Sequence, residues 1–129
     1  RYMEQHFPNG YILIAEGAYM DKRSHEKNLA GMMRHMRNFD ITVESVCRTL
    51  SDQQGVAVLV TADHECGGLK LAKNKSELDR SLYTSGYHTA VDVPYFIRLQ
   101  IAAGVPADYF TERMDNTDIY RIMRSLLGV

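Results

Sequence analysis

The sequence predicts an α/β fold from two continuous apolar runs and one long amphipathic segment between them. Tyr11–Ala15 and Val56–Thr61 are the two runs, and each is typical of a strand buried within a sheet. From Leu29 to Leu50 the apolar residues recur at steps of three and four, which predicts a single long helix able to cover a sheet face. Strand, helix and strand in this order predict a βαβ unit with parallel strands.

The second half of the chain contains weaker signals. The lysine-rich stretch Lys70–Arg80 is expected to be an insertion outside the sheet that includes a short helix. Val91–Leu99 is a candidate strand, although Pro94 argues against a central position for its first part. Asp115 to Thr117 supply a helix N-cap. The terminal helix that follows has an apolar stripe of Ile119, Ile122, Met123 and Leu126.

Composition bounds the class of protein. The chain has 129 residues, of which 45% are hydrophobic and 24% charged, so it fits one soluble domain with a core. The formal net charge of -1 gives no general attraction to nucleic acid or to an anionic membrane surface. No apolar run approaches the roughly 20 residues that cross a bilayer.

The beginning of the chain suggests a piece of something longer. Arg1 is not a methionine, no secretory segment follows it, and the first expected strand begins almost at once at Tyr11. We expect a fragment of a larger protein. The alternative is a mature chain whose signal segment has been removed.

The two cysteines do not form a disulfide framework. Cys47 lies on the apolar side of the expected helix and is expected to be a small core residue. Cys66 follows the second apolar run inside a loop rich in metal-ligand residue types, where a thiol is a candidate soft ligand.

Both expected strands run directly into residues that bind metals. Ligands of open α/β sheets bind beyond the carboxyl ends of the strands. After the first strand come Asp21 and His25, four residues apart, which one helical turn would place on one face. After the second come Asp63 and His64, which can share one metal only beyond the strand end, or can serve two metals.

Imidazole and carboxylate are the usual partners of catalytic zinc. Each pair taken alone is a common coincidence in a polar loop. Their joint occurrence at the ends of two strands favours a metal site more strongly, but from the residues alone the ordinary polar loop stays open as an alternative.

Three stretches of the chain resemble segments of alkaline phosphatases. They are Glu16–His25 (EGAYMDKRSH), Val58–Gly68 (VLVTADHECGG) and Gly86–Pro94 (GYHTAVDVP). The end of the chain from Met114 to Ile119 is similar to the family's closing helix. The resemblance runs in the family's order over nearly the whole chain, so the motifs together are highly specific.

The resemblance implies a role for individual residues. Asp21, His25 and His88 match the ligands of a first zinc ion. Asp63 and His64 match two ligands of a second zinc ion. Glu16 matches a magnesium ligand, and Lys22 matches a variable position that in some members approaches the phosphate. Cys66 stands where we expect threonine, and we expect its thiol to lie outside the inner ligand sphere.

The resemblance also implies what the chain lacks. Residues 1–129 are expected to form the C-terminal metal-binding portion of a three-layer α/β/α domain, with the N-terminal part absent. The nucleophilic serine, the phosphate-binding arginine and one bridging aspartate are expected in that part, so no catalytic residue is assigned here. The intact protein is expected to hydrolyse phosphate monoesters with two zinc ions and one magnesium ion, in the periplasm or outside the cell.

Further expectations concern the isolated chain, alternative functions and the remaining histidines. The isolated chain should be inactive, should need the rest of its own protein and, with a strand edge left without a neighbour, should associate with copies of itself. A phosphodiesterase or sulfatase of the same superfamily is one alternative, against which Glu16 argues. A non-catalytic metal-binding module is the other. His6 and His35 match no family position, and His35 is expected on the solvent side of the long helix.

Overall fold

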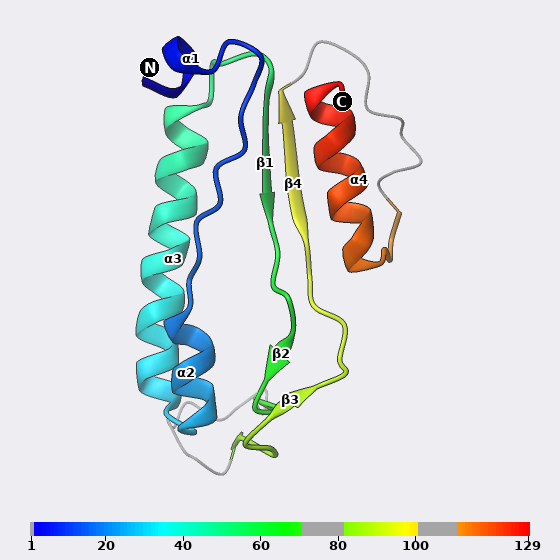
Figure 1. Ribbon diagram of the computed structural model, residues 1–129. Helices are drawn as coiled ribbons and strands as arrows, with labels where there is room; N and C mark the ends of the chain where they lie inside the picture. The colour runs from blue at the N-terminus through cyan, green and yellow to red at the C-terminus, as the bar shows by residue number, and fades with distance from the viewer. Residues whose placement is uncertain (1, 71–81, 101–110) are drawn as a thin grey trace.

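The computed structural model describes residues 2–70, 82–100 and 111–129 (Figure 1). Its helices are α1 (Tyr2–His6), α2 (Tyr19–His25), α3 (Leu29–Thr49) and α4 (Asn116–Leu127). Its strands are β1 (Val56–Val60), β2 (Glu65–Cys66), β3 (His88–Thr89) and β4 (Phe96–Gln100). The chain is therefore a mixed helix and sheet structure, compatible with part of an α/β fold.

The strands form two small antiparallel ladders. β1 pairs with β4, with Val56 opposite Gln100 and Val60 opposite Phe96. β2 pairs with β3, with Cys66 opposite His88. Because β2 follows β1 and β3 precedes β4, the two ladders continue one another along a narrow arm, with the β2–β3 end beside α2 (Figure 1).

The expected strand at Tyr11–Ala15 is absent, and with it the expected βαβ unit. The segment is extended but makes no backbone hydrogen bond to any other described residue, whereas a strand requires a paired neighbour. β1 instead takes the antiparallel β4 as its partner. Leu13 and Ile14 are 77% and 82% exposed. No described part of the chain therefore buries this apolar run.

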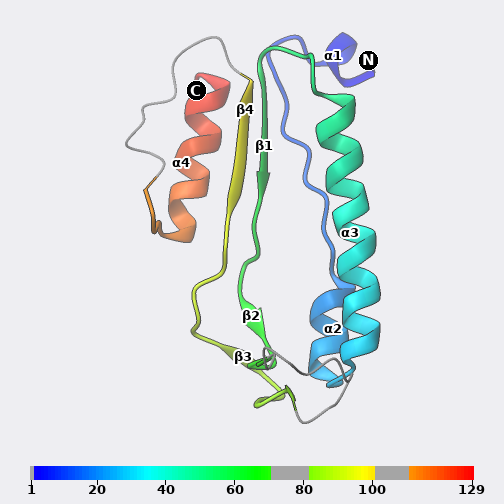
Figure 2. The same cartoon turned by 180° about the vertical axis from the view of Figure 1, so that it is seen from behind.

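The expected long helix and the expected terminal helix are confirmed. α3 begins at Leu29, after Asn28 accepts a hydrogen bond from the Gly31 amide at 2.9 Å as an N-cap. α4 begins after Asp115, which forms a capping box with Asp118, and ends at the left-handed Gly128. In Figures 1 and 2, α3 and α4 lie on opposite sides of the β1–β4 ladder.

The packed core lies at the α2 end of the molecule. It joins the first turns of α3 to the start of the described range 82–100, through Leu29, Met32, Leu82 and Tyr83. Ile122 on α4 is also buried, as its place in the predicted stripe requires.

Three other predictions have separate outcomes. Cys47, expected in a core, is half-buried. The second half of the Val91–Leu99 prediction is confirmed by β4, while its first half, including Pro94, is not a strand. Most of Lys70–Arg80 lies outside the described residues.

Candidate metal centre

α2, β2 and β3 meet at one end of the molecule (Figure 1). Four metal-ligand side chains of these elements lie close together there. α2 carries Asp21 and His25 one turn apart, and the Ser24 hydroxyl between them donates to the Met20 carbonyl at 2.9 Å. The β2–β3 ladder holds His88 directly opposite Cys66. Residues more than 60 positions apart in the sequence are thus brought to one site by a two-residue ladder.

Three ligand atoms form a nearly equilateral triangle. The Asp21 Oδ1 atom lies 3.4 Å from His25 Nε2 and 3.3 Å from His88 Nε2. The two imidazole nitrogens lie 3.2 Å apart. Metal–nitrogen bonds of about 2.0–2.1 Å at tetrahedral angles place two ligand atoms about 3.3 Å apart. The triangle therefore has the dimensions of one face of a tetrahedral zinc site.

The hydrogen bonding of His25 leaves its Nε2 atom free to act as a ligand atom. Its Nδ1 lies 2.8 Å from the Gly86 carbonyl oxygen, which can only accept, so Nδ1 carries the proton. In the neutral ring the Nε2 atom then has a lone pair, and it lies 3.2 Å from His88 Nε2 and 3.4 Å from Asp21 Oδ1. Fixing a ring through a carbonyl on its far nitrogen is the usual arrangement of metal-binding histidines.

The Asp21 carboxylate offers a second ligand atom. Its Oδ1 atom is buried and has no hydrogen-bond donor among the described residues. Burial by itself would raise the pKa of Asp21, but a hydrogen bond with Cys66 and the charges of three nearby histidines hold it below the ordinary value of 3.8. The oxygen therefore remains an anionic acceptor that a metal ion fits.

Cys66 completes a group of four. The Asp21 oxygen, the His25 and His88 ring nitrogens and the Cys66 sulfur all lie within 4.8 Å of one another. The thiol is 3.7 Å from the Asp21 main-chain carbonyl oxygen. Burial first, and then the Asp21 and Glu65 carboxylates, raise the pKa of this thiol to about 12, so the metal-free side chain is a neutral thiol.

The second predicted pair lies next to this group. The His64 ring stacks on His88 with 3.5 Å between ring centroids. The His64 Nδ1 atom is 3.1 Å from the Glu65 carbonyl oxygen, which leaves Nε2 available as a ligand atom, 3.4 Å from Asp63 Oδ2. The Asp63 side chain is largely exposed.

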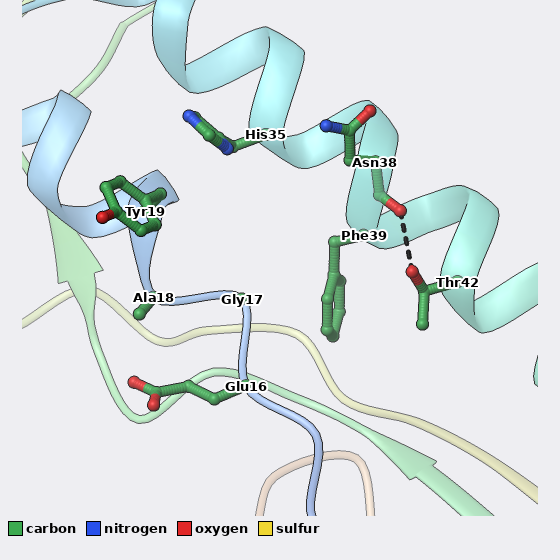
Figure 3. A pocket seen from close by; sticks show the side chains of 8 residues that line it. All are labelled: Glu16, Gly17, Ala18, Tyr19, His35, Asn38, Phe39 and Thr42. Carbon is green, nitrogen blue, oxygen red and sulfur yellow. Dashed lines mark hydrogen bonds between the residues drawn. The ribbon is translucent and has the colours of Figure 1, made fainter.

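Glu16 and Lys22 lie outside the four-residue group. Glu16 is on the chain just before α2 and lines a shallow hollow against α3, walled by Tyr19 and Phe39 (Figure 3). The Lys22 ammonium lies 4.8 Å from the centre of the Tyr19 ring. His35, expected on the solvent side of the long helix, is instead half-buried on the same hollow and stacks on Tyr19 at 5.2 Å.

Glu65 and Thr89 have a supporting role that the sequence did not indicate. The two residues face each other across the β2–β3 ladder, and the Thr89 hydroxyl donates to the Glu65 carboxylate. The other Glu65 oxygen accepts from the Leu69 amide at 3.3 Å. These two hydrogen bonds stabilise the ladder that carries Cys66 and His88. Only knowledge of the strand register would have revealed the pair.

The fold and the donor set together define a class, namely a mixed α/β chain with a candidate metal centre of histidine and carboxylate side chains. Comparison with known proteins then gives the family. Residues 3–78 match the model of the alkaline phosphatase family, and the chain belongs to that family.

Individual relatives agree with this assignment. Alkaline phosphatase 4 of Bacillus subtilis is 23% identical over 110 residues, which cover 85% of this chain and 23% of that protein. The repressible alkaline phosphatase of Saccharomyces cerevisiae is 36% identical over 62 residues, covering 47% of this chain and 11% of the yeast protein. The chain thus spans less than a quarter of either relative. No solved structure matches.

Two general properties of the chain can be stated. Alkaline phosphatases generally use metal ions, and the group at α2, β2 and β3 provides a ligand cluster for one. Across the described ranges, no helix combines the length and the apolar character that crossing a membrane requires.

Proposed function

We propose that this chain supplies zinc ligands to an enzyme that hydrolyses phosphate monoesters. The observation that carries the proposal is the triangle of Asp21, His25 and His88, whose edges of 3.2–3.4 Å fit a tetrahedral zinc ion. Membership of the alkaline phosphatase family supplies the reaction class.

Each predicted ligand has a place in this proposal. Asp21, His25 and His88 hold a first zinc ion, and Asp63 with His64 contribute to a second. Glu16 contributes to a magnesium site whose other ligands come from outside these residues, in keeping with its position apart from the four-residue group. When bound, two such ions polarise the phosphoryl group and stabilise the attacking and leaving oxygens of an in-line displacement.

The chain's own side chains orient and hold the site. The Gly86 and Glu65 carbonyls bind Nδ1 of His25 and His64, respectively, and leave Nε2 of each ring as its ligand atom. Lys22 is proposed to approach the substrate phosphate. Its ammonium lies over the Tyr19 ring on the same helix as Asp21, and it would have to swing from the ring to reach a bound anion.

The remaining machinery is proposed to come from parts of the protein outside residues 1–129. These parts would provide the serine nucleophile, and their strands would pair with the extended Tyr11–Ala15 segment in a three-layer sheet. The exposure of Leu13 and Ile14 supports this pairing. A periplasmic or extracellular location is proposed on family membership alone.

A comparison of the full-length gene product with the 129-residue chain tests the proposal. Phosphate release from a chromogenic monoester should proceed at rates on the order of 10 per second for the full-length protein with zinc and magnesium, and the chain alone should show no such turnover. His25→Ala and His88→Ala should each lower the full-length rate by at least about 100-fold. His6→Ala, which removes an exposed histidine of α1, should leave the rate unchanged. Full activity in the His88→Ala variant would contradict the proposal.

A further inference from the structure

The position of Cys66 gives the site a donor that the phosphatase function does not require. β2 places Cys66 opposite His88, and the residue after it, Gly67, has a φ of +89° that turns the chain sharply at this point. The side chain is half-buried, and its sulfur lies 3.7 Å from the Asp21 main-chain carbonyl. The thiol is therefore held beside the helix that carries two of the three triangle residues.

The four donor atoms are close enough for one ion to bind them all. They lie within 4.8 Å of one another, and three of them already have tetrahedral spacing. A sulfur ligand bonds zinc at about 2.3 Å, so its separation from the other ligand atoms in a tetrahedral site is about 3.6 Å. No separation in the group is larger than 4.8 Å, which exceeds that distance by about 1.2 Å.

We propose that Cys66 is a fourth protein ligand of the ion held by Asp21, His25 and His88, which makes the site selective for a thiophilic divalent cation such as zinc. This inference rests on the proposed function, because it assumes that the triangle binds a metal. On binding, the S–H bond breaks, the proton passes to solvent water, and a metal–sulfur bond forms. Thiolate favours zinc over the hard cations that carboxylate oxygens prefer.

A fourth protein ligand also affects access to the ion. Catalytic zinc sites keep one position open, whereas sites with four protein ligands are closed. With Cys66 bound, a phosphate oxygen can reach the ion only if the thiolate leaves or the ion becomes five-coordinate. Cys66 would then control entry to the site as well as metal choice.

Cobalt spectroscopy of the 129-residue chain tests this inference without an activity readout. Titration with Co²⁺ alone should produce the intense near-ultraviolet charge-transfer absorption of a thiolate–cobalt bond. Cys66→Ser should abolish that absorption and weaken Co²⁺ binding by about 10-fold or more. Cys47→Ser, which removes the half-buried thiol of α3, should retain both. Circular dichroism shows whether each variant keeps its helices, and Cys66→Thr provides a second substitution if serine disturbs folding.

The outcomes separate this inference from the proposed function. Co²⁺ binding that is lost in His88→Ala but shows no charge-transfer absorption in the unmodified chain would overturn the role of Cys66 and leave the three-ligand site standing. Equal absorption and affinity in Cys66→Ser would do the same. If Co²⁺ does not bind, or binds equally well to His88→Ala, the metal site itself is overturned, and the inference with it.

Discussion

Gly67→Ala should damage both the fold and the metal site. Gly67 has a φ of +89°, and a left-handed conformation costs a residue with a Cβ about 1–2 kcal/mol. The added Cβ would also lie 2.5 Å from Cδ1 and 2.8 Å from Cε1 of Tyr83, a ring that is only 4% exposed. Overpacking of this kind costs about 1–3 kcal/mol. The total of about 2–5 kcal/mol is a large part of the about 5–15 kcal/mol that stabilises a typical domain.

Gly55→Ala is the matched control for this prediction. Gly55 has a similar φ of +76° but no heavy atom within 4 Å of the position its Cβ would take, so only the backbone cost applies. Urea denaturation should show Gly67→Ala to be less stable than Gly55→Ala by about 1–3 kcal/mol. Zinc affinity should fall only in Gly67→Ala, because Gly67 follows Cys66 and its amide donates to the Tyr87 carbonyl beside His88 at 3.0 Å. Equal stability and equal zinc affinity of the two variants would refute the reasoning.

Two other predictions concern parts of the chain away from the metal. Hydrogen bonds from the backbone and hydroxyl of Thr117 lower the pKa of Asp115 from 3.8. Asp115→Ala should therefore lower the melting temperature of the chain at neutral pH, and the difference from the unmodified chain should shrink as the pH falls through that lowered value. Thermal melts followed by circular dichroism check this, and Asp115→Asn, which still caps, should retain the higher melting temperature. The exposed Leu13 and Ile14 should cause self-association, so Leu13→Lys with Ile14→Lys should shift the chain toward monomer in light scattering, while Tyr120→Lys should not. A monomeric unmodified chain with a cooperative melt would contradict this last expectation.

The helices could be predicted because their determinants are local. The three- and four-residue periodicity from Leu29 and the Asp115 cap act within a few turns, and both helices are present. Strand pairing depends on partners distant in the sequence. Tyr11–Ala15 has the composition of a buried strand, yet no described segment pairs with it, and β1 pairs with β4 instead. Nothing in an apolar run specifies its neighbour.

The same distinction applies to the site. The four-residue spacing of Asp21 and His25 predicted that the two would share a helix face, and they do. The approach of His88 could not be derived from spacing, because it depends on the register of the β2–β3 ladder, and it was expected only from the family resemblance. That register also places Cys66 beside the triangle, whereas the sequence showed only that a thiol lies nearby.

The central claim is that Asp21, His25 and His88 hold one zinc ion. An anomalous difference map from crystals of the zinc-loaded chain, measured at the zinc absorption edge, tests it most directly. We predict a peak about 2.0–2.2 Å from Asp21 Oδ1, His25 Nε2 and His88 Nε2. A zinc peak bound elsewhere, for example at His6 or His35, with no density within the triangle would contradict the claim.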